Sequence, residues 1–263
     1  MGTDELTDSL CLFNPIRIPT NVTMSAPKMK VEIWSDVMCP FCYIGKRKFE
    51  NALSEFENAS DIEIEWKAFQ LSPDMKTNPD KNIHEYLAEH KDISVEQARG
   101  FNDRITLSAK HLGLVYDFDK AIPANSFNAH RFSHLAKQHG LQDAAEERLF
   151  KAYFTDGLNF DDIPTLVELG VEIGLDAAEV KTALEGDAFT EDVRQDIYEA
   201  YQLGVRGVPF FVFDRKMAVS GAQESEIFLE TLQRSFADWR KKNPKPALEM
   251  IEGQVCTPDG KCD

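Results

Sequence analysis

Two cysteines separated by two residues, Cys39 and Cys42, are the side chains of this sequence best suited to chemistry. They stand in "WSDVMCPFCYIG" (34–45), with Pro40 and Phe41 between them. Cysteines at this spacing can supply half the ligands of a zinc site, form a structural disulfide, or act as a redox-active dithiol. Which of the three applies decides what the protein does.

The remaining cysteines favour the redox dithiol. Cys256 and Cys262 could supply the other ligands of a zinc site, but the five residues between them exceed the usual spacing of two to four. With Cys11, to which we assign no role, the five cysteines are odd in number and unevenly placed, which is not typical of a disulfide framework.

Composition and charge limit the partners and the compartment. The 29 basic residues against 45 acidic ones give a net charge of −16, which repels nucleic acid phosphates and anionic lipid surfaces. The sequence contains no apolar run of about 18–20 residues, so no membrane span is expected. Asp4 and Glu5 stand where a signal peptide would be basic, so we expect a cytoplasmic protein, in which structural disulfides are rare.

The surrounding pattern places the dithiol where a strand meets a helix. Residues 31–37 favour a strand, the apolar stripe from Tyr43 to Phe56 favours a helix, and 62–69 alternates as a second strand, which together make a βαβ unit. Unpaired N–H groups and the helix dipole stabilise a thiolate at such a helix start. We therefore expect Cys39 to be the exposed nucleophile and Cys42, one turn deeper, to resolve the mixed disulfide.

The rest of the chain predicts a helical middle and a second strand-bearing part. After a connection at 71–82, helical periodicity runs from 83 to about 204, and Ser94 with Gln97 forms a capping box ahead of a helix to about 112. Further expected elements are helices at 125–139, 142–155, 163–173, 176–185 and 188–203, a hairpin of 209–213 with 216–220, and a helix at 223–240. We therefore expect an α/β domain of 30–72 with 205–242, a helical subdomain of 73–204, an N-terminal extension of 1–29 and a tail of 243–263.

"CPFC" after the first strand and "GVPFFVF" (207–213) before the hairpin and last helix carry a family resemblance, supported by "NSFNAHRFSHLA" (125–136). From about residue 30 to 240, the chain resembles the thioredoxin superfamily, specifically the DsbA-type oxidoreductases of the FrnE-like subgroup. The resemblance implies a thioredoxin-like fold with a large helical insertion between the βαβ and ββα halves. It also implies that Pro209, on its own an ordinary first residue of a strand, is cis and faces the dithiol.

The same resemblance implies a thiol–disulfide oxidoreductase, or a disulfide isomerase, that acts on protein or peptide disulfides. Val208 would pair with the substrate backbone, with Pro40 and Phe41 beside it as further substrate contacts. No bound cofactor is required, because the redox-active disulfide carries the electrons, with glutathione as a candidate reductant. Some DsbA relatives carry His at the position of Phe41. Because Phe41 offers no charge to a thiolate, we expect a couple that is less oxidising than the strongest oxidants.

Two further groups of residues have open roles. "CTPDGKC" (256–262) contains a turn that could bring Cys256 and Cys262 within disulfide distance, as a second dithiol of the kind found in some FrnE-like proteins, or the two are idle thiols. His130 and His134 lie one helical turn apart, which suits either a metal ion or ordinary polar contacts.

Two other functions remain as alternatives. One is a glutathione-dependent isomerase or transferase resembling the 2-hydroxychromene-2-carboxylate isomerase and kappa-class group, whose members have serine at the nucleophile position. The other is a chaperone-like holdase in which the dithiol is secondary. The expected partners are disulfide-containing proteins or peptides, and the sequence leaves monomer and homodimer equally open.

Overall fold

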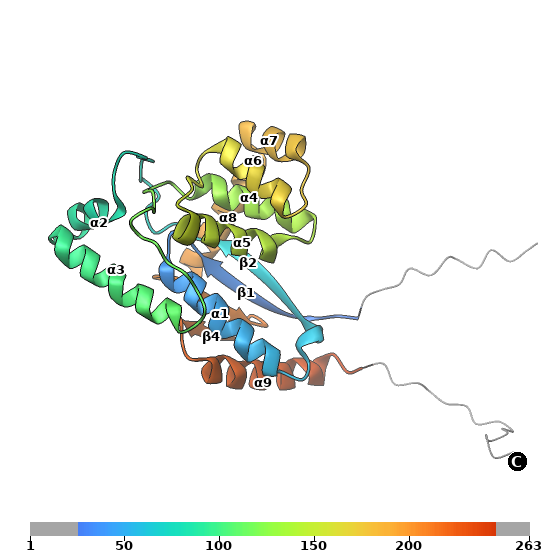
Figure 1. Ribbon diagram of the computed structural model, residues 1–263. Coiled ribbons are helices and arrows are strands. Elements are labelled where there is room, and N and C mark those ends of the chain that lie inside the picture. Colours follow the sequence, from blue (N-terminus) through green and yellow to red (C-terminus); the bar gives the residue numbers. More distant parts are fainter. Residues whose placement is uncertain (1–25, 246–263) are drawn as a thin grey trace, which may run out of the picture.

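A four-stranded mixed sheet with the order β2-β1-β3-β4 lies at the centre of the computed structural model, which describes residues 26–245 (Figure 1). β1 (Met29–Ser35) pairs in parallel with β2 (Ile62–Ala68). β3 (Phe210–Phe213) is antiparallel to β1, and β4 (Met217–Ser220) is antiparallel to β3. The predicted βαβ and ββα halves therefore share one sheet.

One face of the sheet is covered by α1 (Pro40–Glu55) and α9 (Ser225–Lys242), which pack against each other (Figure 1). Aromatic rings fill this layer: Phe211 of β3 lies 5.5 Å from Phe49 of α1 and 4.6 Å from Phe228 of α9. All three are buried, and such aromatic pairs contribute strongly to a core. This packing fixes the position of α1, and with it the dithiol at the start of that helix.

The segment between β2 and β3 is helical, and its last helix, which contains Ala200, covers the other face. Because side chains alternate along a strand, Trp34 and Val212 point to this face, where they form a second apolar cluster with Ala200. α5 and α8 contact β2, whereas α2 and α3 extend to the side of the first turn of α1 (Figure 1). The helices of this segment are α2 (Ile83–Lys91), α3 (Val95–Lys110), α4 (Phe127–Gln138), α5 (Gln142–Lys151), α6 (Ile163–Glu172), α7 (Ala177–Glu185) and α8 (Thr190–Gln202).

The predicted fold class is confirmed, and element ends differ by a few residues. The capping box of Ser94 and Gln97 is present at the start of α3. The helix expected at 142–155 ends at Lys151 and continues as a π-helical turn at Ala152–Asp156. A short 3₁₀ helix, Ala59–Asp61, precedes β2. None of the helices between residues 26 and 245 combines the length and apolar character needed to cross a membrane.

Candidate active site

The two cysteines of the dithiol lie on the first turn of α1. Cys39 is the N-cap residue, with an extended backbone at φ −84° and ψ 110°. Its N–H donates to the Asp36 carbonyl at 2.9 Å, and the Cys42 N–H donates to the Cys39 carbonyl at 3.0 Å. Pro40 follows at the first helical position, where the missing N–H costs little. The two cysteines form no disulfide bond with each other in this structure.

The Val208–Pro209 segment, which leads into β3 beside β1, faces this turn. The Val208–Pro209 peptide bond is cis, and the Cys39 thiol donates to the Val208 carbonyl at 3.4 Å. Gly221 N–H donates to the Pro209 carbonyl at 2.8 Å, which ties the segment to the end of β4. The fold thus brings together Cys39 and Val208, which are 169 residues apart in the sequence.

A glycine of α1 makes this approach possible. A Cβ atom added to Gly45 would lie 2.9 Å from Cγ of Pro209 and 3.4 Å from Cζ of Phe211. Ordinary carbon contacts are about 3.5–4.0 Å, so a side chain at this position would push the Pro209 segment away from the helix. Gly45 was not among the residues predicted to form the site, although a glycine about one helical turn beyond Cys42 is a signal for close backbone approach.

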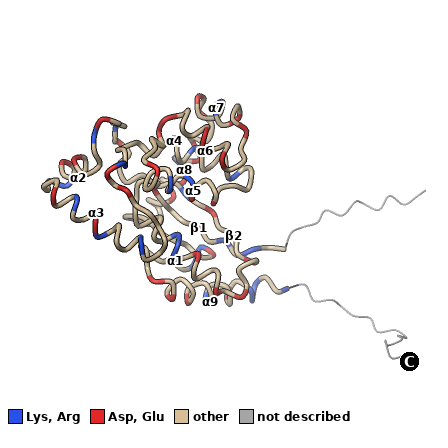
Figure 2. The backbone as a smooth tube through the Cα atoms, in the orientation of Figure 1, with Lys and Arg blue, Asp and Glu red and all other residues tan. Residues whose placement is uncertain are grey.

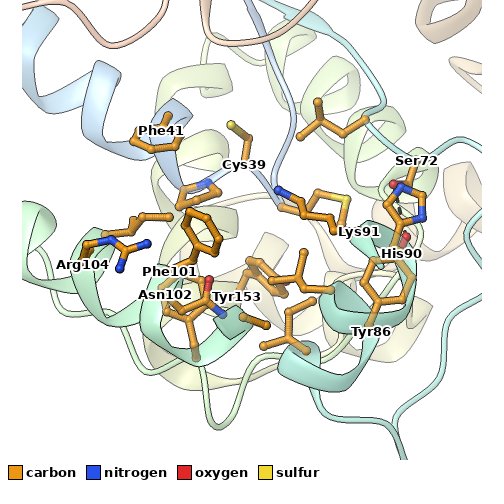
Figure 3. A pocket seen from close by; sticks show the side chains of 18 of the residues that line it. Cys39, Phe41, Ser72, Tyr86, His90, Lys91, Phe101, Asn102, Arg104 and Tyr153 are labelled. Atoms are coloured by element: carbon orange, nitrogen blue, oxygen red, sulfur yellow. Dashed lines mark hydrogen bonds between the residues drawn. The ribbon is translucent and has the colours of Figure 1, made fainter. Parts of the chain in front are cut away.

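The expectation that Cys39 is exposed is wrong. Its relative exposure is only 4 %, and its sulfur lies against the Val208 carbonyl. Cys39 instead lines a cavity of about 720 Å³ between the start of α1 and the helices α2 and α3 (Figure 3). Phe41, at 47 % exposure, stands at the edge of the same cavity. The cavity is therefore an open space next to the Cys39 side chain.

Cys42 is more deeply buried, with an exposure of 1 %. Burial raises the pKa of the Cys42 thiol well above its ordinary value, and the neighbouring Cys39 sulfur raises it further. A thiol in this environment stays protonated and unreactive at neutral pH. The arrangement agrees with the predicted role of Cys42 as the second sulfur to react.

Buried polar groups support the loop before the dithiol. The fully buried Asp36 carboxylate accepts from the Leu71 N–H at 2.7 Å, and its other oxygen lies 3.7 Å from Nε2 of His130. That same Nε2 donates to the Phe69 carbonyl at 2.9 Å. Burial alone would lower the pKa of His130, but the Asp36 carboxylate raises it above its ordinary value. Asp36 thus links the dithiol loop to the chain after β2, a role the sequence analysis missed.

The two histidines considered as metal ligands make polar contacts. His130 contacts Asp36 and Phe69, whereas His134 Nε2 lies 2.8 Å from Oδ2 of Asp196. Across the described range 26–245, there is no cluster of three or more His, Cys, Asp or Glu side chains that could hold a metal. Cys11, Cys256 and Cys262 lie outside the described residues, so the second dithiol stays a prediction.

A tyrosine from the irregular segment after α3 binds Pro40, the first of the two residues between the cysteines. The Tyr116 hydroxyl donates to the Pro40 carbonyl at 2.8 Å. Its ring stacks on Phe154 at 4.5 Å and on Tyr43 at 6.1 Å, so the ring position is fixed by packing. Because Tyr116 belongs to a stretch without periodicity and lies 76 residues from Pro40, no sequence signal indicated this contact.

Comparison with known proteins identifies the family. Residues 30–233 match the model of the DSBA-like thioredoxin domain. The chain belongs to this family. This result confirms the predicted DsbA-type relationship, whereas the FrnE-like subgroup stays a prediction.

Individual relatives of this DSBA-like chain cover most of its length. A probable DsbA oxidoreductase, SCO1869 from Streptomyces coelicolor, is 38% identical with a TM-score of 0.75, over 89% of this chain and 98% of that one. The uncharacterized protein YwbO from Bacillus subtilis (strain 168) is 29% identical over 81% of this chain and 98% of its own. The cytosolic disulfide reductase DsbM from Pseudomonas aeruginosa, also solved with glutathione, is 18% identical with a TM-score of 0.55, over 81% of this chain and 98% of that one. DsbM therefore supports the fold alone.

Proposed function

We propose that this DSBA-like protein is a thiol–disulfide oxidoreductase acting on protein or peptide disulfides. The Cys39 thiolate attacks one sulfur of the substrate disulfide, so that a Cys39–substrate S–S bond forms, the substrate S–S bond breaks, and the departing sulfur takes up a proton. The Cys42 thiolate then attacks Cys39, which forms the Cys39–Cys42 disulfide and releases the second substrate thiol. Two electrons pass from the dithiol to the substrate, and the steps can run in reverse.

The contact between the Cys39 sulfur and the Val208 carbonyl carries this proposal. It supports a site in which an extended substrate chain lies along Val208, as an added strand would. The Val208 N–H has no hydrogen-bond acceptor among residues 26–245, and the residue is partly exposed. A free backbone donor beside the reactive sulfur is what pairing with a substrate backbone requires.

The protein needs a thiol to restore its dithiol after each turnover. We propose glutathione for this step: two glutathione molecules reduce the Cys39–Cys42 disulfide and leave as glutathione disulfide. The structure of DsbM with glutathione supports the compatibility of this fold with that thiol. We further propose a cytoplasmic location, where glutathione is abundant. In this proposal no bound cofactor is required, because the two sulfurs carry the electrons.

Reduction of insulin by the full-length protein, with glutathione as reductant, tests this function. The wild-type protein should turn over, Cys39→Ser should lose the activity, and Cys42→Ser should accumulate a mixed disulfide with the substrate. Cys11→Ser serves as the matched control because the same exchange is made at a cysteine without an assigned role. Refolding of scrambled ribonuclease in parallel would separate an isomerase from a simple reductase.

Two outcomes would support the alternatives instead. Suppression of insulin aggregation that persists in Cys39→Ser, without disulfide turnover in the wild type, would favour the holdase. Glutathione-dependent conversion of 2-hydroxychromene-2-carboxylate by a protein inactive on disulfides would favour the isomerase group.

A further inference from the structure

The cavity beside Cys39 is larger than a disulfide needs. Its volume of about 720 Å³ lies within the range of about 300–1,000 Å³ that binds drug-sized ligands. Its walls come from the start of α1, from α2 and α3, and from Gly207 and Val208. A cysteine side chain would fill a small part of this space, so the cavity has room for a neighbouring side chain of the substrate.

The walls of the cavity are mainly apolar. Ile83, Leu87 and Ile105 line it from α2 and α3, and Tyr153 lines it from the π-helical turn after α5. The ring of Phe101 stands in the cavity and is 51 % exposed, although a phenylalanine gains free energy from burial. Exposed aromatic groups that cluster around a hollow are typical of a binding surface. An aromatic or large aliphatic side chain would be the best occupant.

The charges around the cavity differ from those of the whole chain. Acidic positions outnumber basic ones 45 to 29 in the sequence and are spread over the helices, as Figure 2 shows. Yet of the described residues that line the cavity, none is Asp or Glu, and two are the cations Lys91 and Arg104. Figure 3 shows these cations on opposite sides of Phe101, with Cys39 at the edge of the space between them.

Both cations are available to a ligand. Neither side chain forms an ion pair with any residue in the part of the chain that the structure describes. The Arg104 guanidinium lies 4.6 Å from the centre of the Phe101 ring, and this contact holds the group in place without using up its N–H donors. A guanidinium in this state matches a carboxylate, which it binds through two parallel hydrogen bonds.

We propose that this cavity selects peptide disulfides whose cysteine is flanked by an aromatic or large aliphatic residue and by an acidic residue. The apolar side chain would contact Phe101 and Ile105, and the carboxylate would pair with Arg104 or Lys91. The proposal rests on the proposed function, because the cavity is useful to a substrate only if Cys39 reacts. Glutathione offers two carboxylates but no large apolar group, so it would use the cations and leave the apolar walls unfilled.

The test compares symmetrical peptide disulfides that differ at two positions within three residues of the cysteine. One position is Phe or Ser, and the other is Glu or Gln. The peptides are made in two series, one with both varied positions before the cysteine and one with both after it. Pre-reduced protein is mixed with each disulfide, and the second-order rate constant for peptide thiol release is measured by chromatography. Glutathione disulfide and the small neutral 2-hydroxyethyl disulfide are measured in the same way.

The best peptide with Phe and Glu should react on the order of tenfold faster than its counterpart with Ser and Glu, since a largely buried aromatic side chain stabilises a complex by at least that factor. Its preference for Glu over Gln should be about twofold to fivefold, as for a partly exposed ion pair. In the double variant R104Q/K91Q the Glu/Gln ratio should fall to one. The control K110Q removes a cation from the last turn of α3, away from the cavity, and should retain the ratio.

Equal rates for all peptides, with 2-hydroxyethyl disulfide still reduced, would overturn the inference and leave the proposed function in place. A faster reaction with glutathione disulfide than with the best peptide would also overturn it. Failure to reduce any of the disulfides would instead overturn the proposed function itself.

Discussion

Replacing Gly45 by alanine tests how closely α1 and the Pro209 segment must approach. The new methyl carbon would lie 2.9 Å from Cγ of Pro209, about 0.6–1 Å closer than an ordinary contact. Neither side can yield easily, because the proline ring is rigid and its carbonyl is held by Gly221. The segment must therefore shift, and Val208 would move with it, away from the Cys39 sulfur.

Two opposing terms set the expected stability change. Alanine in place of glycine inside a helix contributes about 1 kcal/mol of stability. Overpacking a tight core contact costs about 1–3 kcal/mol. The balance is a free energy of unfolding lowered by up to about 2 kcal/mol. The effect on disulfide reduction should be larger, about tenfold or more, because a misplacement of about 1 Å can cost up to two orders of magnitude in rate.

Gly100→Ala is the matched control. Gly100 lies inside α3, and an added Cβ would meet only Nη1 of Arg104, at 4.0 Å. This variant should be more stable than wild type by about 0.5–1 kcal/mol, because only the helix propensity term remains. Urea unfolding and insulin reduction measured on both variants decide the matter. If Gly45→Ala were stabilised as much as Gly100→Ala and kept full activity, the close contact would have no functional importance.

Three further predictions concern groups around the dithiol. Because burial raises the pKa of Cys42, the step that resolves the mixed disulfide should accelerate as the pH rises from about 7 to 10, and a flat rate of peptide release would contradict this. Tyr116→Phe removes the hydrogen bond to the Pro40 carbonyl and should lower the free energy of unfolding by about 0.5–1.5 kcal/mol in urea, whereas no change would mean that the bond contributes nothing net. Protonated His130 is favoured in the folded state, so its stabilising effect is complete below its ordinary pKa of 6.5 and lost as the pH rises through the raised value. The stability lost in His130→Gln should therefore be larger at about pH 5.5 than at about pH 8.5, and the opposite trend would rule out its pairing with Asp36.

The elements that carry the dithiol were predictable because their signals are local. The alternation of 62–69 and the apolar stripe after Cys42 each reflect a single face packed against the core, so β2 and α1 begin and end within two residues of expectation. The hairpin followed from Asp214 and Arg215, which both adopt the positive φ that a tight turn between two strands requires. Local chemistry of this kind does not depend on distant residues.

The burial of Cys39 and the cavity beside it depend on residues far away in the sequence. Exposure was expected from a helix start alone, but the cover over the sulfur comes from Val208, and the cavity walls come from helices beginning at Ile83 and Val95. Tyr116 was out of reach for a related reason: it acts through one hydroxyl, and nothing in the spacing of its neighbours indicates a partner. Tertiary contacts that join one side chain to one carbonyl leave no periodic trace in the sequence.

The contacts that hold the dithiol are made largely to backbone atoms. The Cys39 sulfur contacts the Val208 carbonyl, Tyr116 contacts the Pro40 carbonyl, and the Pro209 ring occupies the space that Gly45 leaves empty. Substitution of a side chain elsewhere on the first turn of α1 therefore leaves this geometry in place. We therefore expect replacement of Phe41, the half-exposed side chain between the cysteines that lines the cavity, to change substrate preference and redox poise without moving the two sulfurs.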